Sequence, residues 1–293
     1  MKRDNSINWK YQEPEKLDLS GVNVAVIGGT GGIGRAIAHQ LASRGASVLV
    51  VGQTFRDSDK EGIEFIKADL SLVGEAQRVA HTLPAETLDI VLFTTGIFAS
   101  PKREETEEGI ERDLAVSYLS RYVILQEIAP KLGRPSVLPG VGTRVFIMGY
   151  PGTGKVGNVD DLNSDKSYGV MSAHMNTVAG NEVLVLDSKE RYPGFKVYGL
   201  NPGLIKSNIR SNLTGAGTLK GRFVEWLIGL TSQNAENYAR LITPLLVSPD
   251  IEKHNGALFD KKGLAVLPSP GLTRDYVRRF MDASEALVSR AGF

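Results

Sequence analysis

Three glycines, Gly28, Gly32 and Gly34, follow the apolar run Val24–Ile27 with the spacing G-x-x-x-G-x-G. Such glycines suit a dinucleotide-binding turn: one permits the sharp turn, one lets the backbone approach a pyrophosphate, and one allows the next helix to pack closely on the strand. The N–H groups at the helix start and the helix dipole would hold the phosphates. A tight turn without a ligand is the alternative. The strand, turn and helix context favours a cofactor site formed by Gly28, Thr30, Gly31, Gly32, Ile33 and Gly34.

The residues after the second expected strand, Ser47–Val51, bear on the choice of cofactor. An acidic side chain there would bind the ribose hydroxyls of NAD. This sequence instead has Gly52-Gln53-Thr54-Phe55-Arg56, with no carboxylate to repel a 2′-phosphate. Gln53 and Arg56 are therefore expected to contact NADP, and NAD is the less favoured cofactor. A solvated loop with an incidental arginine is the alternative.

The elements that position these residues alternate along the chain. The predicted strands cover Val24–Ile27, Ser47–Val51, Ile63–Lys67, Leu88–Phe93, Thr143–Met148 and Phe195–Leu200. The predicted helices run from the glycine turn to about Ser43, then over Val73–Thr82 with Ser71 as its expected cap, Ile110–Ile128 and Met171–Ser188. Repeated strand–helix units predict an α/β fold: a single Rossmann-type, doubly wound parallel sheet with ligands at the carboxyl ends of its strands.

The domain organisation expected is one large domain over 20–293, preceded by a polar arm over 1–19. Near the C-terminal end, 207–231 combine Gly215, Gly217 and Gly221 with an apolar helical stripe. We interpret this segment as a helical lid over the substrate end of the cofactor, with plain core packing as the alternative.

The composition excludes several classes of function. The formal net charge is +1, and no basic run interleaved with aromatic residues suggests a nucleic-acid partner. There is no cysteine, and the four histidines show no spacing typical of metal ligands, so no metal site is expected. No apolar run is long enough for a membrane span, and the absence of cysteine suits a cytoplasmic protein.

Over 19–288 the order of these motifs resembles the short-chain dehydrogenase/reductase family, in particular its retinol-dehydrogenase-like branch. The glycines match the family's cofactor turn, although Ile27 replaces the usual threonine. Thr94-Thr95-Gly96 stands where the family has Asn-Ala-Gly, and Pro202-Gly203 with Ser207 matches an element that contacts the nicotinamide carboxamide. The resemblance also implies a possible homo-oligomer. The cofactor contacts that it implies are Asp69, at the adenine, together with Leu70, Thr95, Gly96, Pro202, Gly203, Ile205 and Ser207.

The catalytic positions of the family, Asn, Ser, Tyr and Lys, are all changed. A gapless register through Asn163, Thr177 and Asn181 places His174 at the tyrosine and Val178 at the lysine. Tyr168 stands six residues before the tyrosine position and has Ser172 rather than Lys four residues later. In the same alignment Tyr150 stands at the catalytic serine, and Ser117 at the asparagine.

This replacement has chemical consequences. A valine can neither bind the nicotinamide ribose nor lower the pKa of a phenol by its charge. An imidazole ordinarily titrates near 6.5, against about 10 for a phenol, so it supplies a proton without a lysine's help. We interpret His174 as a general acid/base and Tyr150 as a hydroxyl donor to a substrate oxygen. The alternative is that both side chains line a disused pocket.

Three functions remain open on this evidence. The first is an atypical NADP-dependent oxidoreductase that acts on a carbonyl, imine or activated alkene of a small-molecule substrate. The second is a binding protein that retains the nucleotide without catalysis. The third is a non-redox cyclase or isomerase built on the same fold.

Overall fold

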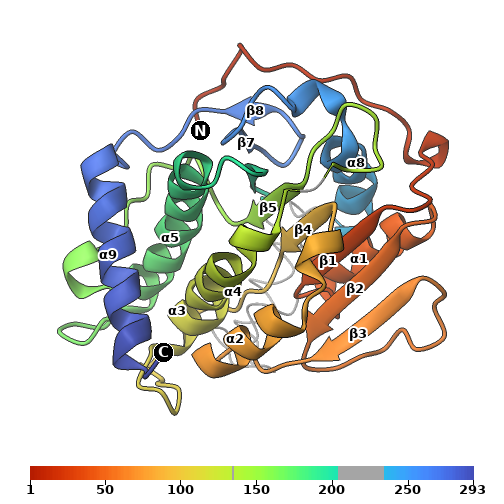
Figure 1. Cartoon of the computed structure of the whole chain (residues 1–293). Coiled ribbons are helices and arrows are strands. Elements are labelled where there is room, and N and C mark those ends of the chain that lie inside the picture. Colours follow the sequence, from red (N-terminus) through yellow and green to blue (C-terminus); the bar gives the residue numbers. More distant parts are fainter. Residues whose placement is uncertain (134, 204–233) are drawn as a thin grey trace, which may run out of the picture.

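The computed structural model describes residues 1–133, 135–203 and 234–293. These residues form one eight-stranded sheet with the strand order β3-β2-β1-β4-β5-β6-β7-β8 (Figure 1). Every neighbouring pair is parallel except β7 and β8. The strands are β1 (Asn23–Ile27), β2 (Ser47–Gly52), β3 (Ile63–Lys67), β4 (Ile90–Phe93), β5 (Arg144–Met148), β6 (Lys196–Leu200), β7 (Leu258–Phe259) and β8 (Ala265–Val266).

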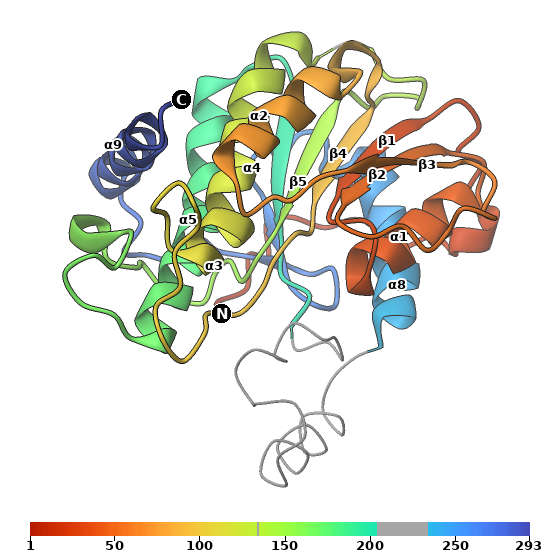
Figure 2. The ribbon, with the colours of Figure 1, turned by 90° about the horizontal axis from the view of Figure 1, so that it is seen from below.

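Helices cover both faces of this sheet (Figure 2). One face carries α1 (Gly32–Ala42) and α8 (Ala235–Val247), and the other carries α2 (Val73–Thr82), α4 (Ser120–Ile128) and α5 (Val170–Arg191). A further helix, α9 (Arg274–Arg290), packs outside on α5. Short helical turns are η1 (Pro14–Lys16), η2 (Ala85–Thr87), η4 (Ala129–Lys131), η5 (Val159–Asp161) and η7 (Pro249–Ile251). The predicted doubly wound parallel sheet is confirmed.

The strands are apolar because both of their faces are buried. Ala25 and Ile27 of β1 belong to the core under α2, α4 and α5, whereas Val24 and Val26 belong to the core under α1 and α8. Alternate side chains of a strand point to opposite faces, so a strand between two helical layers needs apolar residues at every position. This is why the sequence shows continuous apolar runs rather than alternation.

The structure differs from the sequence-based expectation in two places along the sheet and its helices. Six strands were expected, but the sheet has two more, β7 and β8. Each has only two residues, which is too short for a run of apolar residues to identify it in the sequence. The helix expected over Ile110–Ile128 begins instead as α3 (Arg112–Leu114), widens into the π-helical turn η3 (Ala115–Leu119) and continues as α4.

The expected cap of α2 is wrong. Ser71 does not cap this helix, because its hydroxyl donates to Asp69 Oδ1 at 2.8 Å. The Glu108 carboxylate accepts hydrogen bonds from the N–H groups of Val73 and Gly74, at 2.6 and 3.0 Å. A carboxylate at a helix N-terminus satisfies the same free N–H groups and complements the helix dipole.

The N-terminal residues lie along the edge of the sheet beside β8 (Figure 1). Arg3 forms an antiparallel bridge with Val266, and the Trp9 Nε1–H donates to the carbonyl of Gly263 at 2.6 Å. Leu19 at the end of this stretch is buried in the core under α1 and α8. The expected lid, 207–231, lies outside the described residues. Within the described ranges, no helix is both long and apolar enough to cross a membrane.

Candidate active site

A cavity of about 440 Å³ opens where β4, β5 and β6 end and where β1 passes into α1. Its far wall comes from the π-helical turn, α4 and the first turns of α5. Ligands of open α/β sheets bind at this edge, outside the carboxyl ends of the strands. Seven of the residues expected from the sequence line the cavity: Ile33, Gly96, Ser117, Tyr150, His174, Pro202 and Gly203.

The glycine turn has the conformation that its sequence suggests. Gly28 has φ +95°, and a Cβ there would lie 2.5 Å from the backbone nitrogen of Thr95. A Cβ on Gly34 would lie 2.3 Å from Thr94 Oγ1 and 2.5 Å from Gly28 O, so α1 packs directly on the strand ends. Gly31 precedes α1, where no side chain caps the helix and open space surrounds the missing Cβ. The first N–H groups of α1 therefore fit a phosphate.

The region expected to hold the adenosine end is formed by the loop after β2. Arg56 is exposed, and its guanidinium donates to the carbonyl of Thr30 in the glycine turn at 3.2 Å. Burial would raise the pKa of Asp69, the expected adenine contact, but Ser71 and the nearby Gln53 side chain hold it below its usual value. Leu70, the next expected contact, is a buried core residue. The loops after β2 and β3 thus bring the expected residues to the same edge of the sheet.

A carboxylate that the sequence reading did not consider, Asp57, lies in this loop. Arg35 donates three hydrogen bonds of 2.6 to 3.0 Å to it, and His39 Nε2 lies 2.9 Å from Oδ1. The hydrogen bonds from Arg35 hold the pKa of Asp57 below its usual value. This buried carboxylate is therefore occupied by α1 and is not free to bind ribose hydroxyls.

The nicotinamide end is expected between the ends of β4 and β6. Thr95 is not itself in the cavity lining, but its neighbours Thr94 and Gly96 are. Its buried hydroxyl has no hydrogen-bond partner among the described residues, and such a hydroxyl suits a polar ligand group. Gly203 has φ +69°, and its N–H donates to the side chain of Asn201 at 3.0 Å. Ile205 and Ser207, also expected here, lie outside the described residues.

His174 and a buried aspartate form the central interaction of the cavity wall. His174 Nδ1 lies 2.7 Å from Asp113 Oδ2, and its ring stacks on Phe98 with 4.0 Å between ring centroids. The Ser117 hydroxyl donates to the other oxygen, Asp113 Oδ1, at 2.5 Å. The Asp113 side chain is fully buried, whereas that of His174 is 20% exposed. Asp113 and Ser117 thus fix the orientation of an imidazole that reaches the cavity.

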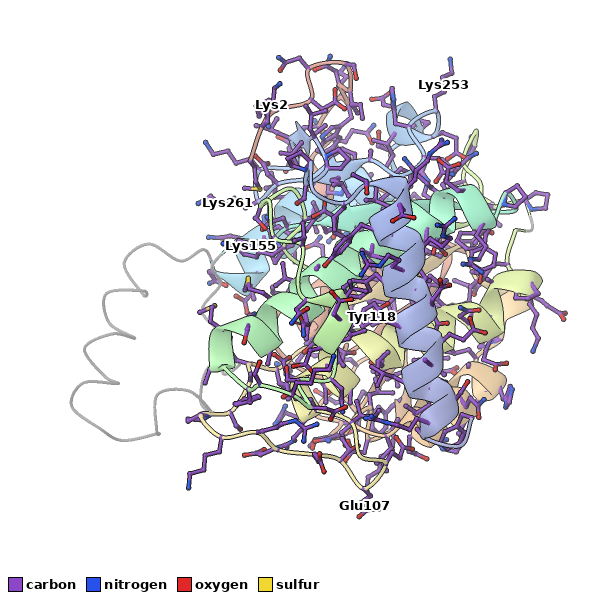
Figure 3. All side chains as sticks on the ribbon, turned by 90° about the vertical axis from the view of Figure 1, so that its left-hand side faces the viewer. Lys2, Glu107, Tyr118, Lys155, Lys253 and Lys261 are labelled. Atoms are coloured by element: carbon purple, nitrogen blue, oxygen red, sulfur yellow. The ribbon has the colours of Figure 1, made fainter. Side chains whose placement is uncertain are left out.

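The π-helical turn places Ser117 against α5. A Cβ on Gly180 of α5 would lie 2.6 to 2.8 Å from ring atoms of Tyr118, so only glycine allows this approach. Tyr118 lies beside α9 (Figure 3). Its hydroxyl pairs with Ser284 of α9 at 2.7 Å. The side chain of Asn181, next to Gly180, donates to the carbonyls of Ser117 and Thr177 at 2.9 and 2.8 Å. Local π-helical turns are frequent at functional sites.

The two tyrosines near the site differ in availability. Tyr150 lines the cavity, and its hydroxyl has no partner among the described residues. The Tyr168 hydroxyl donates to the carbonyl of Ser100, and burial raises the pKa of Tyr168. Tyr168 is therefore committed to a backbone contact and is a poor proton donor, while Tyr150 is free to contact a ligand.

A buried arginine lies in the same wall as Val178. Arg121 of α4 donates to the carbonyls of Thr95 and Met148 and, at 2.8 Å, to Asn181 Oδ1. Burial lowers the pKa of Arg121 to about 9, against the opposing charge of Asp113, so this side chain is charged at neutral pH. The cavity lining therefore includes a positively charged side chain, Arg121, although position 178 on α5 is a valine.

Sequence reasoning missed Asp113, Arg121 and Phe98. The available signal was the spacing of four that separates Asp113, Ser117 and Arg121, because residues four apart share one helix face. Across the described part of the chain, no group of three His, Cys, Asp or Glu side chains could hold a metal ion.

Comparison with known proteins gives a consistent result. Residues 22–139 match the family described as short chain dehydrogenase. An uncharacterized oxidoreductase of Saccharomyces cerevisiae is 53% identical over 294 residues, covering 99% of this chain and 95% of the relative. Retinol dehydrogenase 14 of Homo sapiens is 24% identical over 303 residues, covering 92% of this chain and 87% of that protein.

Solved structures show the same fold at low sequence identity. A putative uncharacterized protein from Mycobacterium paratuberculosis superposes with a TM-score of 0.63 at 17% identity, covering 96% of this chain and 98% of the other. The Pseudomonas aeruginosa RhlG/NADP active-site complex gives a TM-score of 0.61 at 21% identity, covering 84% of this chain and 97% of the other.

Proposed function

The chain belongs to the short-chain dehydrogenase family, and on this premise we propose that it uses NADP(H) to reduce a carbonyl group of a small molecule, with His174 as the proton donor. The observation that carries this proposal is the Asp113–His174 pair in the cavity wall. A proton donor favours a carbonyl over an iminium, because the carbonyl oxygen must gain a proton on reduction and an iminium nitrogen need not.

The residues present fit the cofactor that the family implies. The open N-terminus of α1 at Gly31 would hold the pyrophosphate, and Arg56 with Gln53 would contact the 2′-phosphate. The unpartnered hydroxyl of Thr95 and the backbone at Gly203 would hold the nicotinamide half. The bound nicotinamide supplies the hydride.

His174 moves the proton in this proposal. Because Nδ1 is held by Asp113, Nε2 is the nitrogen left to donate to a substrate oxygen in the cavity. The Asp113 carboxylate stabilises the protonated imidazole before transfer and keeps the proton on Nδ1 afterwards. Tyr150 donates a second hydrogen bond to the same oxygen. The Ser117 hydroxyl keeps Asp113 in place.

The experiment is to follow NADPH oxidation with a panel of small aldehydes and ketones. His174→Ala is expected to lower turnover by about 10²-fold or more, the usual scale for a lost general acid. His81→Ala is the matched control, since His81 is exposed on α2, where it pairs with Glu127. Full activity of the His174→Ala variant would reject acid catalysis by this residue.

The same assay separates the alternative functions. Tight NADPH binding without turnover of any carbonyl, imine or activated alkene would support a nucleotide-binding protein without catalysis. Conversion of a substrate to an isomer with no net NADPH consumption would support a cyclase or isomerase.

A further inference from the structure

Arg121 is a buried cation without a carboxylate hydrogen-bonded to it among the described residues. Arg121 is 3% exposed, and its guanidinium donates to the carbonyl oxygens of Thr95 and Met148 and to the amide oxygen of Asn181. The Asp113 carboxylate acts on this charge only without a hydrogen bond. A buried charge whose hydrogen bonds all go to neutral groups costs stability, because its hydration is replaced incompletely. Such a residue needs an explanation beyond the packing of the fold.

The guanidinium has donors left over. It carries five N–H groups, of which two on Nη1 and one on Nη2 are accounted for by these three acceptors. Nε is buried and has no hydrogen-bond partner among the residues that the structure describes. Buried N–H groups are nearly always satisfied, so an unsatisfied one in a cavity wall points to a ligand.

The position of Arg121 indicates which ligand group it meets. Thr95 lies just after β4, and Met148 is the last residue of β5. The guanidinium therefore lies across the carboxyl ends of both strands. The same cavity is lined by Gly96 and Gly203 of the expected nicotinamide region. The neighbouring wall position on α5 is Val178, which has no donor. Position 178 therefore offers a ligand hydroxyl no hydrogen bond, whereas Arg121 of α4 has N–H groups to spare.

We propose that Arg121 binds the hydroxyl oxygens of the nicotinamide ribose and so positions the reacting half of the cofactor. This inference rests on the nucleotide site of the proposed function, and it goes beyond that function by assigning the ribose contact to a residue of α4. The planar fork of the guanidinium suits two neighbouring hydroxyl oxygens.

The test measures binding rather than turnover, by calorimetric titration with NADPH, ADP-ribose and ADP. ADP-ribose carries the second ribose without the nicotinamide, and ADP lacks both. Arg121→Met is expected to weaken NADPH and ADP-ribose by about 10-fold or more, the usual effect of losing hydrogen bonds from a charged group, and ADP by less than about twofold. Arg121→Lys, which keeps the charge but loses the fork, is expected to give an intermediate loss and serves if the methionine variant does not fold.

The matched control is Arg144→Lys. Arg144 is equally buried, but it lies at the other end of β5 and bonds Glu252 and the carbonyl of Leu246. This variant should lower stability and leave the affinity for ADP-ribose relative to ADP unchanged.

Three outcomes would overturn the inference. Equal losses for all three ligands, or no loss for any, would show that Arg121 only ties the strand ends together. Failure of the wild-type protein to bind NADPH would overturn both the inference and the proposed function. Selective binding losses in a protein that reduces no carbonyl would sustain the inference and reject the proposed function alone.

Discussion

Asp113 and His174 are 61 residues apart in sequence, and 2.7 Å separate Asp113 Oδ2 from His174 Nδ1. One comes from α3 and the other from α5, so the contact depends on how these two helices pack beside the cavity. The carboxylate is inaccessible to solvent, and the imidazole reaches the cavity. In the proposed reaction this arrangement would leave Nε2 as the nitrogen that donates the proton, because Nδ1 is held by Asp113.

Replacing Asp113 by Asn is expected to lower carbonyl reduction by about 10²-fold, because the amide cannot stabilise the imidazolium and permits the wrong tautomer. Steady-state rates of NADPH oxidation by the wild type and the variant, measured at the same pH, give this loss. Asp187→Asn is the control, because Asp187 pairs with Arg191 on the outer part of α5. Unchanged turnover in the Asp113→Asn variant would show that the pair has no part in proton transfer.

The close contact between Gly180 and Tyr118 gives a prediction on stability. Alanine in a helix interior is ordinarily better than glycine by up to about 1 kcal/mol. At position 180 the added methyl would lie 2.6 to 2.8 Å from the Tyr118 ring, and overpacking of this kind costs about 1 to 3 kcal/mol. We therefore expect Gly180→Ala to lower the free energy of unfolding by about 1 to 2 kcal/mol in urea denaturation.

A double-mutant cycle tests the cause. With Tyr118→Leu in place, the clash is removed, and Gly180→Ala should cost much less or become stabilising. Equal effects of Gly180→Ala in both backgrounds would mean that the ring of Tyr118 is not what requires the glycine.

The fold was predictable because its determinants are local. The glycines of the turn at Gly28–Gly34 and the buried strands such as β4 leave marks within a few residues of sequence. The strands β7 and β8 gave no such sequence signal, because two residues are too few to show an apolar run or an alternation. The π-helical turn was likewise not visible in the sequence, since Tyr118 within it packs on Gly180 and Phe280, which are far away in the chain.

The candidate site was predictable only in part. The alignment register identified His174, Tyr150 and Ser117, because they occupy positions that the resemblance marks. It could not identify Asp113 or Arg121, whose importance comes from burial and from partners on other elements. Their hydrogen bonds join groups distant in sequence, and no short-range pattern encodes such a contact.

Asp57 gives a prediction on pH and stability. The hydrogen bonds from Arg35 lower the pKa of Asp57 in the folded protein. The interaction therefore contributes fully above the unfolded-state pKa, near 3.9, and its contribution is lost as the pH falls through the folded-state value. Asp57→Asn should lower the free energy of unfolding at pH 7 by on the order of 1 kcal/mol, a value that allows for the partial exposure of Arg35.

Denaturation of both proteins at pH 7 and pH 3 measures this effect. The difference between wild type and Asp57→Asn should shrink at the lower pH, and the exposed neighbour Asp59→Asn should show little change at either. A difference that stays constant with pH would mean that the carboxylate charge is not what Arg35 recognises.

Arg56 gives the last prediction, which concerns the choice of cofactor. Its guanidinium is exposed and lies over the glycine turn, where it donates to Thr30 O at 3.2 Å. The nearest carboxylate of this loop, Asp57, is occupied by Arg35. We expect the wild-type protein to bind NADPH more tightly than NADH, and Arg56→Ala to weaken NADPH by about 10-fold with little effect on NADH. Arg78→Ala is the control, since Arg78 pairs with Glu75 on α2.

Gln53→Asp tests the same preference from the opposite direction. An aspartate at this exposed position would offer the ribose hydroxyls of NADH a carboxylate and would repel the 2′-phosphate of NADPH. Its expected result is a reversed ratio of the two dissociation constants, measured by titrating the fluorescence of each reduced cofactor. If Arg56→Ala weakens both cofactors equally, Arg56 supports the turn through Thr30 and does not read the phosphate. Tighter binding of NADH by the wild-type protein would overturn the preference for NADP(H) altogether.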